Sequence, residues 1–448
     1  MGKKKPKKIQ DYNSVYSFLR YYVDFSLHEA YSKIEYKGLD KIPKDSAIIF
    51  APNHTNALMD ALVILSLDHR QKVFVARADI FKNPKIKKIL TFLKIMPIMR
   101  VRDGLDEVRK NDKIIDKSVD VLKDNVPFCI LPEGRHRAQH SLLPLSKGIF
   151  RIALQAQDVL QKENLPLYIV PVGLEYGNFF RFRSTIFVQI GDPINIAEYV
   201  SEHQDLTHPD LIKSLKAELT ERMKDVILYI PDDDKYDSTF EVCAAVINQQ
   251  VTRYLKDHPK ERRQSLQTRY SSNRITVSEI TKAREEKPEA IEEIFQKADK
   301  ARDLRLSKNI SLGSVIMKNP FWSRLIKFIV FIITLPYTIP TGILTLPVTG
   351  VAAFIFSKMK DRAFYNSIRF VVTLVLWPIL LIIYAIIAYC TLPWLWALII
   401  TLALVPGTII TQDSYKLSRL IVSDIKLMNN KKLRKIYTEI RQLYYDKI

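Results

Sequence analysis

The chain contains 448 residues, with 68 basic and 48 acidic side chains that give a formal net charge of +20. A hydrophobic fraction of 47% and a charged fraction of 26% are near globular averages, which excludes a wholly disordered or collagen-like chain. Its 3 cysteines lie far apart, so a disulfide framework is excluded and a reducing compartment is favoured. The positive charge favours a polyanionic partner: an anionic membrane surface, a phosphorylated substrate or nucleic acid.

Residues 1–34 are expected to form a basic tail followed by an amphipathic helix. Tyr12, Tyr16, Leu19 and Val23 recur at helical spacing among polar residues. The lysines at the start are not followed by an apolar segment, so this is not a secretory signal. The basic tail either contacts anionic lipid or is simply solvated.

Residues 35–225 alternate short apolar runs with amphipathic segments. Short apolar runs that end at prolines or polar residues are typical of buried strands. Their alternation with helices predicts an α/β domain with a mostly parallel sheet flanked by helices. The expected strands are 46–52, 72–76, 127–132, 167–173 and 187–190, and the expected helices are 57–67, 84–93, 105–123 and 146–160.

Residues 226–315 are dense in charge and give no strand signal. An Asp-Asp-Asp-Lys run at residues 232–235 stands near their start. They are expected to form a helical linker domain whose charged faces contact solvent.

Residues 316–448 are expected to be a membrane-associated region with transmembrane or re-entrant helices. Residues 328–357 and 370–412 contain no Asp, Glu, Lys or Arg, and about 20 apolar residues suffice to cross a bilayer. The second stretch can cross twice, with a turn at Thr391–Pro393. Prolines in the first stretch predict a kinked span or a re-entrant hairpin. The alternative for both stretches is a buried helical core. Because the flanks are basic, the positive-inside rule places them, and the α/β domain, on the cytoplasmic face of an integral membrane protein.

The first candidate site follows the apolar run that ends at Pro52. His54 lies in the next loop, and Asn56 can cap the helix that begins at Ala57. Open sheets place ligands at such a turn from strand to helix. A carboxylate of Asp60 bound to one ring nitrogen of His54 would leave the other nitrogen as a base for a hydroxyl proton. The alternative is a capping histidine and an unrelated helical aspartate.

The second candidate site is the Pro-Glu-Gly-Arg-His-Arg run that begins at Pro132. Gly134 lets a ligand approach the backbone closely. Arg135 and Arg137 can hold phosphate oxygens bidentately, or they belong to a basic turn. Lys147, just before an apolar helix, would supply a further cation.

Two other segments carry notable residues. Arg100 follows an apolar run directly and is either a phosphate ligand or a surface charge. Pro171 interrupts a strand-like run, which predicts a sheet edge or a bulge there.

In this order, the four segments resemble the sequence blocks of the glycerolipid acyltransferase superfamily, the glycerol-3-phosphate and 1-acylglycerol-3-phosphate acyltransferases. The resemblance covers roughly residues 35–200. The matching residues are His54 and Asp60 in the Asn-His-x4-Asp block, Arg100 in the arginine block, Glu133 and Gly134 in the Phe-Pro-Glu-Gly-Thr-Arg-Ser block, and Pro171 in the proline block. Two departures stand out. The gap between histidine and aspartate has five residues, as in a branch that resembles fungal glycerol-3-phosphate/dihydroxyacetone-phosphate acyltransferases, and Arg-His-Arg replaces Thr-Arg-Ser.

The resemblance implies membrane-bound acyl transfer in phospholipid synthesis. His54 would accept a glycerol hydroxyl proton, Asp60 would orient its ring, and the oxygen would attack the thioester of acyl-CoA or acyl carrier protein. The residues implied for the acceptor phosphate are Arg100, Glu133, Gly134, Arg135, Arg137 and Lys147, with Pro171 structural at the acyl site. The implied partners are the bilayer, the thioester donor and the glycerol phosphate acceptor; no metal, other cofactor or nucleic acid is expected. The alternatives are a lysophospholipid acyltransferase with another acceptor, or a non-catalytic membrane protein that binds anionic lipid.

Overall fold

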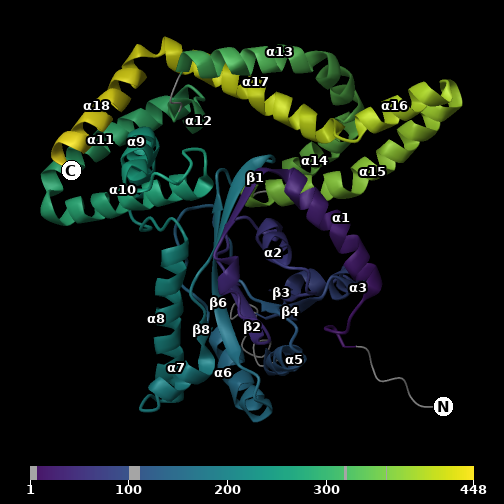
Figure 1. Ribbon diagram of the computed structural model, residues 1–448, viewed down its shortest axis with the longest axis vertical. Coiled ribbons are helices and arrows are strands. Elements are labelled where there is room, and N and C mark those ends of the chain that lie inside the picture. The colour runs from purple at the N-terminus through teal and green to yellow at the C-terminus, as the bar shows by residue number, and fades with distance from the viewer. Residues whose placement is uncertain (1–7, 100–110, 317–319, 360) are drawn as a thin grey trace. The chain divides into compact units, whose positions relative to one another are not determined.

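The computed structural model describes residues 8–99, 111–316, 320–359 and 361–448 of the chain (Figure 1). The chain folds into two compact units. The N-terminal unit consists of Met1–Ile227 and the short segment Asp361–Ser367. The C-terminal unit consists of Leu228–Lys360 and Ile368–Ile448.

The N-terminal unit is built around a sheet of eight strands. The strands are β1 (Tyr31–Lys37), β2 (Ala47–Pro52), β3 (Val73–Arg77), β4 (Ile95–Ile98), β5 (Phe128–Cys129), β6 (Leu167–Tyr176), β7 (Ser184–Ile190) and β8 (Ile194–Asn195). Their spatial order is β1-β7-β6-β2-β5-β3-β4, and β8 pairs with β6. β6 is antiparallel to β7 and β8, whereas the other described pairs are parallel. The prediction of a mostly parallel sheet flanked by helices is therefore confirmed.

Helices flank this sheet (Figure 1). They are α1 (Ser14–Ala30), α2 (Leu58–Leu65), α3 (Pro84–Phe92), α5 (Asn111–Lys123), α6 (Gly148–Leu160), α7 (Ile196–Glu202) and α8 (His208–Val226). Ala47, Ile49 and Ala51 on one face of β2 share a fully buried core with Phe150 of α6 and Leu215 of α8. This apolar packing fixes the strand whose carboxyl end carries the candidate site.

β1 lies partly where the sequence predicts the N-terminal helix. α1 ends at Ala30, so the expected helical segment over residues 1–34 is too long, and Tyr31 begins the strand. β1 occupies one edge of the sheet and pairs only with β7 in the described order. An edge strand tolerates charged side chains such as Lys33 and Glu35, which hide its strand pattern in the sequence.

Pro171 lies in an interior strand rather than at an edge. It pairs with Ala51 of β2 on one side of β6. On the other side, β8 pairs with Tyr168 and Ile169, and β7 pairs from Val172 onward. Pro171 therefore stands where β6 changes partners, and its missing N–H interrupts neither ladder. The prediction of an edge or bulge was wrong for this reason.

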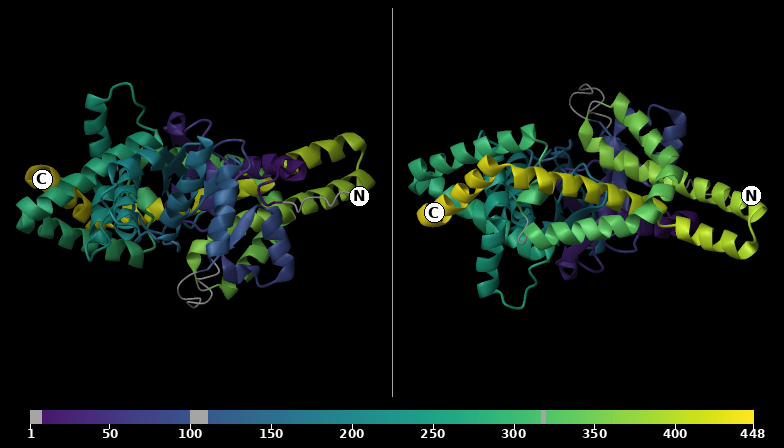
Figure 2. Two further views of the ribbon diagram at one scale, coloured as in Figure 1. Left: turned by 90° about the horizontal axis from the view of Figure 1, so that it is seen from below. Right: turned by 90° about the horizontal axis from the view of Figure 1, so that it is seen from above.

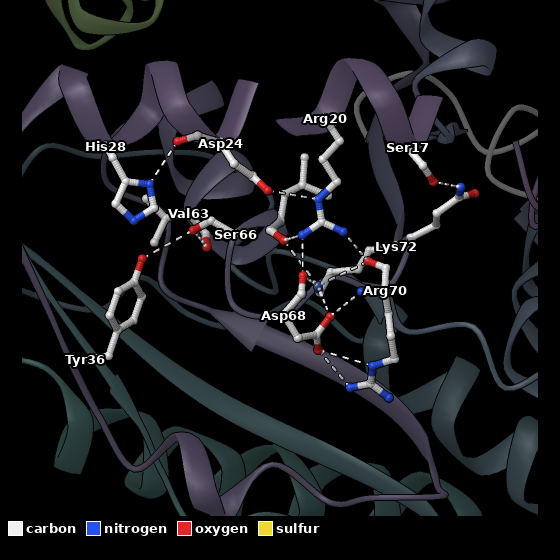
Figure 3. A network of polar contacts seen from close by, with 12 residues as sticks. Ser17, Arg20, Asp24, His28, Tyr36, Val63, Ser66, Asp68, Arg70 and Lys72 are labelled. Carbon is white, nitrogen blue, oxygen red and sulfur yellow. Dashed lines mark hydrogen bonds and ion pairs between the residues drawn. The ribbon is translucent and has the colours of Figure 1, made fainter. Parts of the chain in front are cut away.

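A cationic cluster fixes α1 to the carboxyl end of α2 (Figure 3). The guanidinium of Arg20 donates to the backbone oxygens of Leu65, Asp68 and Arg70. The ammonium of Lys72 is fully buried and donates to the oxygen of Leu65 and, over 2.6 Å, to the carboxylate of Asp68. These donors satisfy carbonyls that the end of α2 leaves unpaired.

The C-terminal unit contains a helical bundle. Its helices are α9 (Tyr236–Asp257), α10 (Leu266–Glu286), α11 (Pro288–Ser307) and α18 (Lys431–Lys447). The end of the chain thus packs with the predicted helical region, because Leu433 and Ile440 of α18 are fully buried in its core. Arg305 pairs with the buried carboxylate of Glu241 over 2.7 Å.

The apolar helices of the C-terminal unit are α13 (Pro320–Leu344), α14 (Leu346–Lys358), α15 (Tyr365–Thr391), α16 (Trp394–Leu404) and α17 (Gly407–Asn429), preceded by the short α12 (Leu312–Val315). Among the described residues, Phe321–Leu344 and Arg362–Thr391 are long and apolar enough to cross a membrane, and α16 with α17, bent by 51°, would make a third span. α13 and α17 lie side by side (Figure 2). The break between α15 and α16 falls at the predicted turn.

Candidate active site

His54 and Asp60 are in direct contact at the carboxyl end of β2. The strand ends at Pro52, His54 lies in the following loop, and Asp60 lies in the first turn of α2. The distance from Nδ1 of His54 to Oδ2 of Asp60 is 2.8 Å. Asp60 is fully buried, whereas 17% of the His54 side chain is exposed. The pair therefore has a buried carboxylate and an imidazole that solvent can reach.

Four donors converge on the Asp60 carboxylate. Oδ2 accepts hydrogen bonds from the backbone N–H groups of Thr55 and Asn56 at 2.9 and 2.8 Å. Oδ1 accepts one from the hydroxyl of Tyr176 at 2.7 Å. An ionised carboxylate only accepts, so Nδ1 of His54 is the donor to Asp60. The lone pair of Nε2 is then free to act as a base.

The loop between His54 and α2 is strained so that it turns toward Asp60. Ala57 adopts φ 47° and ψ −121°, a conformation that residues with a side chain rarely adopt. Such a backbone costs of the order of 1–3 kcal/mol and persists where the surrounding contacts enforce it. Here the two N–H bonds to Asp60 provide that enforcement.

Glu133 connects the His54 loop to a second loop. Its Oε1 accepts from the N–H of His54 at 2.6 Å, and its Oε2 accepts from the N–H of Leu143 at 2.9 Å. Burial raises the pKa of Glu133 to about 7, although the two N–H bonds oppose this shift. The sequence predicted a phosphate ligand here, but both oxygens already accept hydrogen bonds from backbone N–H groups. The contacts instead make Glu133 a support for His54.

The predicted cationic residues differ in whether they contact the His54 loop. The N–H of Arg137 donates to the backbone oxygen of His54 at 3.1 Å, and its guanidinium donates to Ser141 at 2.7 Å. Arg135 and Lys147 are exposed, with Lys147 at the start of α6. Contacts that tie either of them to His54 are not found within the described parts of the chain. Arg100 lies outside the described residues.

Gly134 and Pro171 have structural features that suit their residue types. Gly134 follows Glu133 with φ 65°, in the left-handed region where glycine carries no steric cost. Pro171 is buried in β6, next to the strand that leads to His54. Tyr176 closes the same strand and was not singled out as a site residue from the sequence. Its position at the end of the predicted proline block was the only available signal.

His136 is a further residue that sequence reasoning missed. Its ring lies edge-on to the His54 ring, with centroids 5.4 Å apart. Its Nε2 lies 2.9 Å from Oδ2 of Asp361, which is 225 residues further along the chain. The Arg-His-Arg run drew attention to the arginines, although the histidine between them lies beside His54.

Comparisons with known proteins match the segment that carries this site. Residues 33–175 match the family model described as Acyltransferase. Over 105 residues the chain is 33% identical to glycerol-3-phosphate O-acyltransferase 1 of Saccharomyces cerevisiae. The aligned residues make up 23% of this chain and 14% of that protein. Over 117 residues it is 32% identical to glycerol-3-phosphate O-acyltransferase 2 of the same yeast, covering 26% and 15%.

The matched part is thus only 14% and 15% of the length of these curated relatives. Among solved structures, the chain is similar to the 1-acyl-sn-glycerophosphate acyltransferase PlsC from Thermotoga maritima. That likeness has a TM-score of 0.35 and 18% identity, and it covers 47% of this chain and 79% of the other.

Proposed function

We propose that this chain, whose residues 33–175 form an acyltransferase domain of the glycerolipid acyltransferase superfamily, is a membrane-bound O-acyltransferase. It moves an acyl chain from a thioester donor to a hydroxyl of glycerol 3-phosphate or 1-acylglycerol 3-phosphate. The observation that carries this proposal is the pairing of His54 with the buried carboxylate of Asp60 at 2.8 Å.

The proposed reaction begins when Nε2 of His54 takes the proton of the acceptor hydroxyl. Asp60 accepts the Nδ1 hydrogen bond and stabilises the imidazolium that forms. The oxygen attacks the thioester carbonyl, the carbon–sulfur bond breaks, and His54 returns the proton to the thiolate. A thioester is already an activated acyl donor, so the proposed reaction requires neither a metal nor a redox cofactor. Acyl-CoA and acyl carrier protein both supply such a thioester.

Cationic side chains are proposed to hold the acceptor phosphate. Arg137 is the best supported, because its backbone already contacts the His54 loop at 3.1 Å. Arg135 and Lys147, both exposed, and Arg100 are proposed as further contacts. Holding the phosphate places the hydroxyl near the base, which is a large part of the rate enhancement in such reactions.

The protein is proposed to be integral to the membrane, with the N-terminal unit on the cytoplasmic face. The helical segments Phe321–Leu344 and Arg362–Thr391 support membrane insertion. The basic residues that flank them support the orientation. In this arrangement the enzyme meets a soluble thioester on one side and releases an apolar product into the bilayer.

An acyl-transfer assay tests the proposal. Full-length protein in phospholipid vesicles is given acyl-CoA with glycerol 3-phosphate, with 1-acylglycerol 3-phosphate or with neither, and both free thiol and labelled lipid are measured. His54→Ala should lower kcat by about 10²–10⁴-fold, the usual contribution of a general base. His69→Ala, at an exposed histidine outside the site, is the matched control.

The alternatives give different results in the same assay. A lysophospholipid acyltransferase with another acceptor would release thiol with lysophospholipids of other head groups, and not with glycerol 3-phosphate or 1-acylglycerol 3-phosphate. A non-catalytic protein that binds anionic lipid would release no acceptor-dependent thiol. Near-normal turnover by His54→Ala would refute the proposed base.

A further inference from the structure

The segment Asp361–Ser367 belongs to the N-terminal unit, although it follows α14 in the sequence and its last three residues begin α15. It lies outside the family match, which ends at residue 175. Asn366 and Ser367 are 1% and 5% exposed, so the segment is packed rather than draped over the surface. The hydroxyl of Ser367 lies 3.5 Å from the backbone oxygen of Asn56, in the His54 loop.

This segment contacts the active site through His136. Oδ2 of Asp361 lies 2.9 Å from Nε2 of the His136 ring. The ring of Phe364 packs edge-on against His136, with centroids 4.7 Å apart. On its other side His136 meets the ring of His54, with centroids 5.4 Å apart. His136 is therefore enclosed between the proposed base and the segment before α15.

The direction of the Asp361–His136 hydrogen bond follows from the state of the carboxyl group. Partial burial raises the pKa of Asp361, but hydrogen bonds from the N–H of Ala363 and from His136 outweigh it and hold the pKa below its usual range. Asp361 is thus ionised at neutral pH and can only accept. Nε2–H of His136 is the donor, and this bond fixes the orientation of the ring.

We propose that Asp361 is a positioning residue of the active site, which holds the His136 ring between Phe364 and His54. The ring of His54 is then restrained twice, by Asp60 at Nδ1 and by His136 against its edge. A base that is restrained in this way keeps Nε2 directed at the acceptor hydroxyl, and small misplacements of reacting groups lower kcat strongly. The segment that leads into α15 therefore completes the catalytic centre.

Asp361 also caps a short helix, and one substitution separates this contact from the contact with His136. Its Oδ1 accepts from the N–H of Ala363 at 2.9 Å and caps the short helix Arg362–Phe364. Asp361→Ser keeps a capping oxygen but is too short to reach His136. Asp192→Asn, at an exposed aspartate that pairs with Lys41, is the control.

The inference rests on the proposed function, and wild-type activity tests that function separately. In the acyl-transfer assay, Asp361→Ser should lower kcat about tenfold with little change in the KM of either substrate. Asp192→Asn should stay within about threefold of wild type. In a His136→Phe background, Asp361→Ser should have no further effect, because partners in contact are not additive. Wild-type kcat in Asp361→Ser, or losses that multiply in the double variant, would overturn the inference.

A second readout does not depend on activity. The full-length protein is treated with diethyl pyrocarbonate, and carbethoxylation of His136 is followed by peptide mass spectrometry. Asp361→Ser should speed the modification of His136 at least threefold, whereas Asp192→Asn should leave it unchanged. Equal rates in all variants would show that Asp361 does not hold the ring, even if the wild-type protein transfers no acyl group.

Discussion

The hydroxyl of Tyr176 donates to Oδ1 of Asp60 over 2.7 Å, and both side chains are buried. Burial raises the pKa of Tyr176 well above its usual range, so the hydroxyl keeps its proton and remains a donor. The carboxylate that faces His54 on one oxygen is thus held on the other by the last residue of β6.

Tyr176→Phe is expected to lower kcat about tenfold. A hydrogen bond to a charged group contributes about 1.5–3 kcal/mol, and its loss leaves Oδ1 of Asp60 without this donor. The carboxylate should then hold the His54 ring less firmly in place, and steady-state kinetics of acyl transfer measure the loss of kcat.

Tyr168→Phe, at another tyrosine of β6, is the matched control and should leave kcat unchanged. Wild-type kcat in Tyr176→Phe would show that this hydrogen bond does not support the site.

The raised pKa of Glu133 predicts that the free energy of unfolding falls as the pH rises. The pKa of its carboxyl is raised to about 7 in the folded protein, against an ordinary value of 4.5. Between these pH values the folded state holds a proton that the unfolded state has lost. This contribution to the free energy of unfolding is therefore fully present below about pH 4.5 and is lost as the pH rises through about 7. The loss between pH 5 and 8 should be about 2 kcal/mol.

Glu133→Gln should remove this dependence, because the amide does not titrate. Thermal unfolding of both proteins from pH 5 to pH 8 measures the difference. The variant should also lose activity, since its amide N–H₂ group faces one of the two backbone donors. Parallel pH dependences in the two proteins would contradict the assignment.

The sequence reveals the site residues that are close together along the chain and misses those that are far apart along it. His54 and Asp60 are recognisable because a strand, a loop and one helical turn bring them together within seven residues. Tyr176 and Asp361 are 116 and 225 residues from their partners, and only the folded chain makes those pairs. Interior strands such as β2 are predictable from unbroken apolar runs, whereas the edge strand β1 carries charges that hide it.

The proposed membrane orientation predicts which residues a reagent can reach from each side. Leu392 lies in the break between α15 and α16, whereas Lys358 ends α14 on the basic flank that is proposed to be cytoplasmic. In a Cys390→Ser background, Lys358→Cys should react with an impermeant maleimide in sealed vesicles whose cytoplasmic face is outward. Leu392→Cys should react only after the vesicles are opened with detergent. Immediate labelling of both positions would exclude a membrane crossing by α15 between Lys358 and Leu392.

The lowered pKa of Lys72 predicts that the free energy of unfolding rises with pH in the alkaline range. Burial lowers its pKa to about 8 from the ordinary 10.5, although the Asp68 carboxylate opposes the shift. Between these values the unfolded state binds the proton more tightly than the folded state, so raising the pH from about 8 to 10 should recover about 2 kcal/mol. Lys72→Met should lack this gain and should already be less stable at pH 7, because the Asp68 carboxylate and the Leu65 carbonyl lose a donor. The gap in unfolding free energy between the two proteins should therefore widen from pH 7.5 to pH 10. A gap that stays constant over this range would mean that the ammonium of Lys72 is not desolvated in the folded protein.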